Sequence, residues 1–167
     1  MKIILFLFML IVPILSSGQN LTYKDYQERI EDRYFFMNEH FLTSDTSQVK
    51  SELQNHLAFD EEIIAFSKQV NRKTYPDSAW VSAIEGKVMQ FTYKNKADIS
   101  FLYLKLGDHE NAIKMFNSSL PYSDYHRVGL SPKKEFEIIN EYYKLPKKVY
   151  NKFVKYALAE LRKNNVF

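Results

Sequence analysis

Histidine is the residue type in this sequence best suited to bind a metal or to move a proton near neutral pH. The chain has four of them, His40, His56, His109 and His126. A helical zinc site of the metalloprotease kind needs two histidines four residues apart with a glutamate between them, and Glu39-His40 lacks the second histidine. We therefore expect all four histidines to pack against other residues or to face solvent, without a metal site.

Carboxylates, glycines and cysteines give no further sign of catalysis. We interpret Asp60-Glu61-Glu62 as the start of a helix, where negative charge interacts favourably with the helix dipole, and not as an acid–base pair. The chain has 4 glycines and no cysteine, which excludes a glycine-rich phosphate loop, a thiol nucleophile and a disulfide. We expect a protein that is not an enzyme and needs no cofactor. The alternative is an enzyme whose site assembles from scattered residues.

The composition favours a helical fold. Of 167 residues, 46% are hydrophobic and 26% are charged, which excludes a disordered chain. Only 4 glycines and 5 prolines are present, too few for the many tight turns of a β-sandwich or barrel. The formal net charge of +3 is too small to indicate nucleic-acid binding. We therefore predict an all-α protein that does not bind nucleic acid.

The first 18 residues have the pattern of a signal peptide. Lys2 is followed by the uncharged run Ile3 to Leu15, and Ser16-Ser17-Gly18 then supplies the small residues that precede signal-peptidase cleavage. We place the cut between Gly18 and Gln19 and expect residues 19–167 to form one helical domain, periplasmic or secreted. The alternative is an uncleaved anchor, although the run is shorter than the about 20 residues of a spanning helix. This beginning resembles exported proteins of Gram-negative bacteria.

The remaining sequence has the period of amphipathic helices. Between Thr22 and Leu42, apolar residues recur every three or four positions and therefore share one helix face. They are Tyr23, Tyr26, Ile30, Tyr34, Met37 and Phe41. The same spacing predicts further helices through Val49–Leu57, from Asp60 to Val70, through Trp80–Phe91, over 97–106, over 109–120, and from each of Pro132 and Pro146.

Residues 97–120 predict two helices joined by a tight turn. Gly107 lies where the chain must turn, and Asp108 can cap the helix that follows. The residues expected to pack between the two helices are Ile99, Ser100, Tyr103, Ala112, Phe116 and Ser119. This pattern resembles a tetratricopeptide repeat (TPR), whose unit is a pair of antiparallel helices. The resemblance covers about 24 to 30 residues, roughly a fifth of residues 19–167.

The sequence also departs from the TPR pattern. Lys96 stands where the family often has an aromatic residue, and Pro121 comes earlier than the closing proline of the family. A stable array needs about three such units. Elsewhere only Tyr142-Tyr143-Lys144-Leu145 echoes the hairpin. Two architectures therefore stay open, a degenerate TPR-like array and an irregular helical bundle with one TPR-like hairpin.

The resemblance implies a scaffold that binds a protein or a peptide. In TPR proteins the first helix of each unit lines a concave groove, which would turn Phe101, Leu104 and Lys105 toward a partner. An apolar and a basic residue in that groove would suit an extended peptide with an acidic group.

The end of the chain offers an alternative function. Residues 131–167 carry 9 basic and 4 acidic side chains, whereas residues 19–130 carry 13 basic and 16 acidic ones. The same end holds the aromatic residues Tyr142, Tyr143, Tyr150, Phe153 and Tyr156. A basic, aromatic surface would bind a small ligand or a polyanion, or contact an anionic membrane. The simpler interpretation is a solvated helix face with its aromatic residues in the core.

Overall fold

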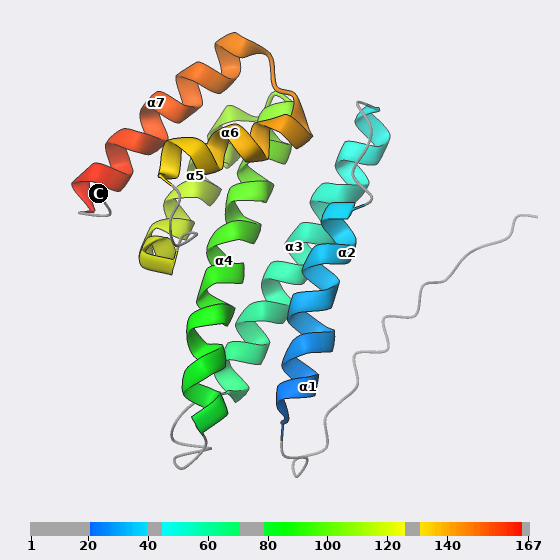
Figure 1. Ribbon diagram of the computed structural model, residues 1–167. Coiled ribbons are helices and arrows are strands. Elements are labelled where there is room, and N and C mark those ends of the chain that lie inside the picture. Colours follow the sequence, from blue (N-terminus) through cyan, green and yellow to red (C-terminus); the bar gives the residue numbers. More distant parts are fainter. Residues whose placement is uncertain (1–20, 40–44, 71–78, 126–130, 165–167) are drawn as a thin grey trace, which may run out of the picture.

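A single helix of 27 residues, α4 (Ala79–Lys105), runs through the protein and contacts helices on both sides of its midpoint. The computed structural model describes residues 21–39, 45–70, 79–125 and 131–164, and all regular structure in these ranges is helical (Figure 1). At 1.5 Å per residue, α4 is about 40 Å long. The all-α fold class predicted from the sequence is confirmed.

The first half of α4 belongs to a three-helix bundle. Its other members are one continuous helix made of α1 (Tyr23–Tyr26), the π-helical η1 (Gln27–Asp32) and α2 (Arg33–Glu39), and the antiparallel partner α3 (Thr46–Gln69). Arg29 and Arg33 both form ion pairs with Glu62 of α3. The core between these helices, here called the N-terminal core, consists of Leu21, Tyr26, Ile30, Tyr34, Met37, Phe59, Ile63, Phe66, Val70, Val81, Ile84, Val88 and Phe91.

The apolar stripe predicted between Thr22 and Leu42 therefore accounts for one wall of this core. Four of its six members are buried there, while Tyr23 is exposed and Phe41 lies outside the described residues. The helix begins with a capping box in which the Thr22 hydroxyl accepts from the Asp25 backbone N–H and the Asp25 carboxylate accepts from the Thr22 N–H.

The second half of α4 is surrounded by the C-terminal helices (Figure 1). These are α5 (His109–Ser119), the 3₁₀ turn η2 (Leu120–Tyr125), α6 (Pro132–Tyr143) and α7 (Lys147–Lys163). Gly107 makes the α4–α5 turn with a φ of 79°, a left-handed conformation that glycine adopts without a steric cost. Asp108 caps α5 by accepting from the Asn111 N–H. Both local features were predicted.

The core around this half, here called the C-terminal core, also receives the first two turns of α3. It consists of Val49, Leu53, Ile99, Phe101, Leu102, Leu104, Ala112, Phe116, Phe136, Tyr143, Leu145, Phe153, Val154, Ala157 and Leu161. Rings from four helices meet in it at edge-to-face angles, with Phe116 and Phe153 5.6 Å apart between centroids. Helices α3 and α4 therefore each contribute to both cores.

Two of the predicted helix boundaries are wrong. The helices expected through Val49–Leu57 and from Asp60 form the single α3, and those expected through Trp80–Phe91 and over 97–106 form the single α4. Neither junction contains proline or glycine, so nothing interrupts the backbone hydrogen bonds. Asp60 and Glu62 are consequently not helix-start residues, because they lie in the middle of α3.

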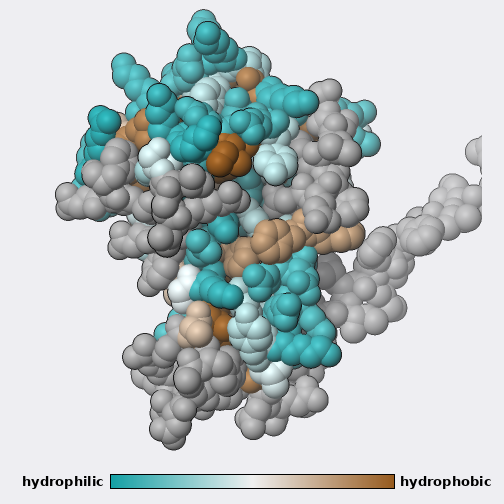
Figure 2. Space-filling model, viewed as in Figure 1, coloured by the Kyte–Doolittle hydropathy of each residue, from teal (hydrophilic) through white to brown (hydrophobic). Residues whose placement is uncertain are grey.

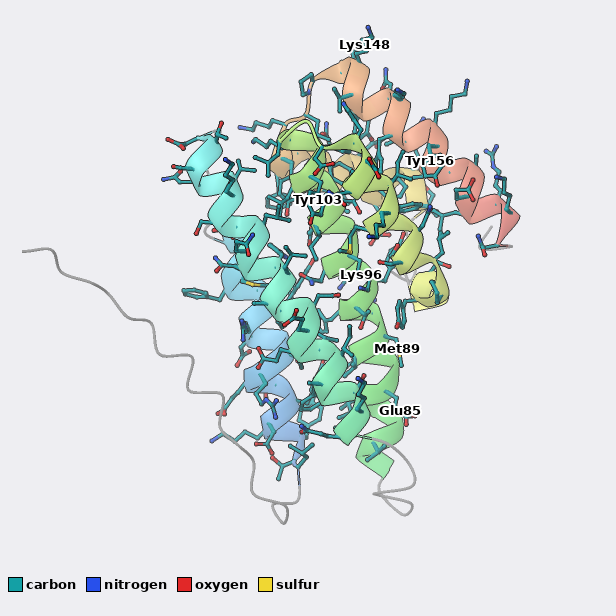
Figure 3. All side chains as sticks on the ribbon, turned by 180° about the vertical axis from the view of Figure 1, so that it is seen from behind. Glu85, Met89, Lys96, Tyr103, Lys148 and Tyr156 are labelled. Atoms are coloured by element: carbon teal, nitrogen blue, oxygen red, sulfur yellow. The ribbon has the colours of Figure 1, made fainter. Side chains whose placement is uncertain are left out.

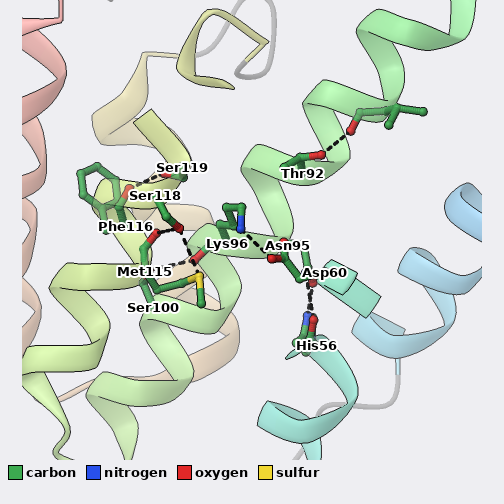
Figure 4. Close-up of polar contacts among 11 residues, drawn as sticks. His56, Asp60, Thr92, Asn95, Lys96, Ser100, Met115, Phe116, Ser118 and Ser119 are labelled. Carbon is green, nitrogen blue, oxygen red and sulfur yellow. Dashed lines mark hydrogen bonds and ion pairs between the residues drawn. The ribbon is translucent and has the colours of Figure 1, made fainter. Parts of the chain in front are cut away.

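A buried polar layer separates the two cores where α3 and α4 pack together. It consists of His56 and Asp60 on α3 and Asn95 and Lys96 on α4 (Figure 4). Lys96 Nζ donates to Asp60 Oδ2 at 2.6 Å, and the two side chains are only 8% and 10% exposed. His56 Nδ1 lies 2.6 Å from Asn95 Oδ1, and Asn95 Nδ2 donates to the His56 carbonyl at 3.0 Å. These contacts set the register of α3 against α4, because another register would leave charges buried without partners.

Replacing one partner of the Lys96–Asp60 ion pair is expected to lower the free energy of unfolding more than replacing both partners. Lys96→Met leaves the Asp60 carboxylate buried without its ammonium partner and should lower the free energy of unfolding by about 3–5 kcal/mol. The double variant Lys96→Met/Asp60→Leu should recover most of that loss. Urea unfolding followed by circular dichroism measures both values, with Lys50→Met, exposed on α3, as the matched control. A cost below about 1 kcal/mol for Lys96→Met would contradict the assigned role.

Candidate functional site

An apolar groove lies between α5 and α7, with a volume of about 130 Å³. We call it the α5–α7 groove, and it is lined by Leu104, His109, Ile113, Val149, Lys152, Phe153 and Tyr156. Leu104 and Phe153 are buried, whereas Ile113 is 38% exposed. The side chain of Ile113 is thus partly open to solvent and lies beside buried apolar side chains. A partner can bury its own apolar groups against this surface.

Contacts between α5 and α7 hold the groove in shape. The Tyr156 hydroxyl donates to Asn117 Oδ1 of α5 at 2.7 Å, and in Figure 3 this tyrosine lies on the side of α7 toward α5. Beneath it, the Phe116 ring packs edge-to-face against Phe153 and Tyr156. The turn at Gly107 and the Asp108 cap start α5 at His109, which sets His109 and Ile113 four residues apart on the same helix face.

The edge of the groove formed by α7 is positively charged. Lys152 lines the groove, and the exposed Lys147, Lys148 and Lys155 lie on the same helix. Lys148 extends outward at the start of α7 (Figure 3). The only acidic residue of α7, Glu160, forms an ion pair with Lys163 at 2.6 Å, near the far end of the helix. The groove therefore combines an apolar floor with a basic edge.

The three residues predicted to bind a partner, Phe101, Leu104 and Lys105, lie in three different environments. Phe101 has no exposed surface, because Phe136, Tyr143 and Phe153 of α6 and α7 surround its ring at 5.5–6.3 Å between centroids. The open groove expected on this face of α4 is thus filled by α6 and α7, which corrects the expectation for Phe101. Leu104, by contrast, borders the α5–α7 groove.

Lys105, the third of these residues, is tied to the turn after α6. Its Nζ donates to the Tyr143 carbonyl at 2.8 Å. Burial lowers the pKa of the Lys105 ammonium, and the nearby positive charge of Lys144 lowers it further. Its structural contact is therefore with the C-terminal end of α6, where the positive charge also interacts favourably with the helix dipole.

The residues predicted to pack inside the hairpin lie between its helices or in its turn. Those that are fully buried are Ile99, Ser100, Ala112, Phe116 and Ser119, whereas Tyr103 is partly buried and Gly107 makes the turn. Each serine hydroxyl donates to a carbonyl of its own helix, Lys96 for Ser100 and Phe116 for Ser119 (Figure 4). The serines thus act as small residues that let α4 and α5 approach.

Of the four histidines, His56 is buried in the polar layer and His109 lines the groove, while His40 and His126 lie outside the described residues. Within the described ranges, no three histidine, aspartate or glutamate side chains form a group that could hold a metal ion. None of the helices in these ranges combines the length and the apolarity needed to cross a bilayer.

A group of buried phenols lies near the middle of α4, and the sequence did not predict it. Tyr34 donates to Asp98 Oδ2 at 2.8 Å across 64 residues of sequence. Burial raises the pKa of Tyr143, and the negative charge of Asp98 raises it further. Burial likewise raises the pKa of Tyr93, followed by the charge of Glu135. No local pattern links these residues, so only the packing of α2, α4 and α6 reveals them.

Tyr93 provides a test of this buried region. Its hydroxyl has no hydrogen-bond partner among the described residues, so Tyr93→Phe should raise the free energy of unfolding at pH 7 by about 1 kcal/mol. Above about pH 10 the unfolded chain ionises its tyrosines while the buried ones stay protonated, so the wild type loses stability as pH rises. The Tyr93→Phe variant should lose less stability at alkaline pH, because it has one buried tyrosine fewer. Urea unfolding at pH 7 and at pH above 10 tests both statements.

The exposed Tyr142 is the matched position, and Tyr142→Phe should leave the stability at pH 7 unchanged. A Tyr93→Phe variant less stable than the wild type at pH 7 would show that the hydroxyl makes a favourable hydrogen bond.

Comparison of the chain with family models, with curated proteins and with solved structures gave no match.

Proposed function

We propose that this protein is a noncatalytic scaffold that binds a protein or peptide partner in the α5–α7 groove. The observation that carries the proposal is the combination of an apolar floor containing Leu104, the partly exposed Ile113 and the basic edge at Lys152. An amphipathic segment binds such a surface by burying two or three apolar side chains, and acidic residues beside them complement the lysines. The proposed partner is therefore a peptide segment with apolar anchors and net negative charge.

The proposal includes a TPR-type hairpin and export from the cytoplasm. The hairpin is supported by the antiparallel α4 and α5, by Gly107 in the turn and by the small Ala112 between the helices. Export is supported by the apolar run of residues 3–15 and by the small residues that end at Gly18. The partner would then be met in the periplasm or outside the cell.

A second candidate function is binding of a polyanion by α7. The exposed Lys147, Lys148, Lys152 and Lys155 favour it, because clustered positive charge attracts any extended anion. This binding would use the lysines without the apolar groove, so the two functions respond differently to salt and to substitutions in the groove.

Selection of peptides from a random display library on the purified protein tests the groove. Enriched peptides should carry net negative charge and apolar residues at a spacing of three or four. Ile113→Asp should weaken their binding at least tenfold, because a buried aliphatic contact is worth about 1.5–3 kcal/mol. Lys152→Glu should weaken it by up to about fivefold, as expected for an exposed ion pair. Fluorescence anisotropy of labelled peptides measures these changes.

The controls add the same charges outside the groove. Ser118→Asp lies on α5 and Lys133→Glu lies on α6, and both positions are exposed. Enriched peptides that still bind the Ile113→Asp variant with unchanged affinity would contradict the proposal that they bind in the α5–α7 groove. Binding that falls steeply with salt, is lost with Lys152→Glu and ignores Ile113→Asp would instead support the polyanion function.

A further inference from the structure

The exposed side of the first helix combines an aromatic ring with acidic side chains. Phe36 of α2 is 64% exposed, more than any other large apolar side chain in the described ranges. Glu28 and Asp32 precede it at intervals of four residues, so the three side chains share one helix face, and all three are exposed. We call these three residues the acidic stripe. Figure 2 shows apolar surface at the level of α2 next to hydrophilic surface.

The helix that carries the acidic stripe has a net negative charge. Residues 21–39 hold 5 acidic and 3 basic side chains. Both arginines of this segment pair with Glu62 of α3, and the exposed Lys24 pairs with Glu28 at 3.3 Å. Among the described residues, no ion pair involves Asp32, the acid one turn before Phe36. Asp32 can therefore pair with a positive charge of another molecule.

The α5–α7 groove has room for one aromatic ring. An apolar cavity of about 150 Å³ is large enough to hold benzene. The groove has a volume of about 130 Å³ and opens to solvent beside Ile113, which is 38% exposed. A phenyl ring placed there would contact Ile113 and the buried Leu104 and Phe153, and it would lose contact with water.

The basic edge of the groove repeats at the interval of the acidic stripe. Lys148, Lys152 and Tyr156 follow one another every four residues on α7, and the last two line the groove. When the two helices run parallel, a Phe36 ring next to Tyr156 therefore places Asp32 next to Lys152. The apolar and the charged positions of the two surfaces match in this one alignment.

The acidic stripe and the α5–α7 groove lie on different sides of the same molecule. Figure 1 shows α2 and α7 on opposite sides of α4, and the two helices are again apart in the reverse view of Figure 3. The acidic stripe of one copy therefore meets the groove of a different copy.

The other strongly exposed aromatic residue of the described ranges, Tyr142, matches the groove less well. It is 56% exposed on α6, and the exposed Lys134 lies two turns before it on the same helix face. Lys134 would repel the lysines of α7, whereas the acids of the acidic stripe attract them. The charge pattern thus favours α2 over α6.

We propose that Phe36 of one copy of this protein enters the α5–α7 groove of a second copy, with Asp32 beside Lys152. This inference rests on the proposed function, because it names a second copy of the chain as the protein partner of the groove. The contact joins two different surfaces and is therefore head-to-tail. Assemblies of this kind close into rings or lengthen as the protein concentration rises.

Sedimentation velocity of the purified protein at increasing concentration tests the association. We expect assemblies larger than the monomer, with a share that grows with concentration. Phe36→Asp and Ile113→Asp should each weaken association at least tenfold, because each places a charge in the apolar part of the contact. Ala65→Asp, exposed on α3, is the matched control and should leave association unchanged. Circular dichroism shows whether each variant keeps its helices.

Mixing the two variants separates a head-to-tail contact from a symmetric one. The Phe36→Asp variant keeps an intact groove, and the Ile113→Asp variant keeps an intact acidic stripe. An equimolar mixture should therefore form a complex with one copy of each variant, although each variant alone stays monomeric. A mixture that stays monomeric would overturn the proposal, even where the wild type associates through another surface.

Charge reversal tests the alignment of the two helices. Asp32→Lys and Lys152→Glu should each weaken association by up to about fivefold, as expected for an exposed ion pair. The double variant Asp32→Lys/Lys152→Glu should recover the loss, because the two charges have changed places. A double variant that associates no better than the single ones contradicts the alignment. These exposed positions also keep the test valid where Phe36→Asp fails to fold.

The same measurements distinguish failure of this inference from failure of the proposed function. The peptides enriched on the groove should dissociate the assemblies, because they occupy the same site. A protein that binds these peptides but stays monomeric at every concentration overturns self-association and leaves the proposed function intact. A protein that neither binds peptides nor associates contradicts both.

Discussion

The ion pair between Lys96 and Asp60 is the contact on which the arrangement of the two halves depends. Both groups are almost completely buried, so each requires the other to compensate for the loss of water. A slide of α3 along α4 by one helical turn would separate them, whereas the apolar residues on either side would tolerate new neighbours. This pair, with the amide of Asn95 beside it, therefore aligns the N-terminal and C-terminal cores at opposite ends of the same two helices.

The α5–α7 groove takes its charge from the segment of the chain that forms its edge. It lies against the C-terminal end of α4, and its edge is formed by α7, in the segment 131–167 that carries 9 basic and 4 acidic residues. Helix packing buries Glu135 of α6, which is only 3% exposed, whereas Lys147, Lys148, Lys152 and Lys155 of α7 stay exposed. The basic residues of this segment are therefore the ones that face solvent.

Features that depend on neighbouring residues were predictable from the sequence. The Thr22 capping box, the turn at Gly107, the Asp108 cap and the proline starts of α6 and α7 are examples, because each is decided within about one helical turn. The Lys96–Asp60 pair joins residues 36 positions apart, and the Tyr34–Asp98 bond joins residues 64 apart. Neither leaves a local pattern. The burial of Phe101 could not be foreseen for the same reason, since it depends on where α6 and α7 dock.

The packing of α3 against α4 explains why a lysine stands at position 96. Helix α4 continues through this position for a total of 27 residues, and Lys96 faces α3 in the polar layer. A lysine with a buried aspartate partner suits that neighbour and an aromatic residue would not, because it would leave Asp60 without its partner. The first half of α4 therefore packs as part of a three-helix bundle, and its last part packs against α5.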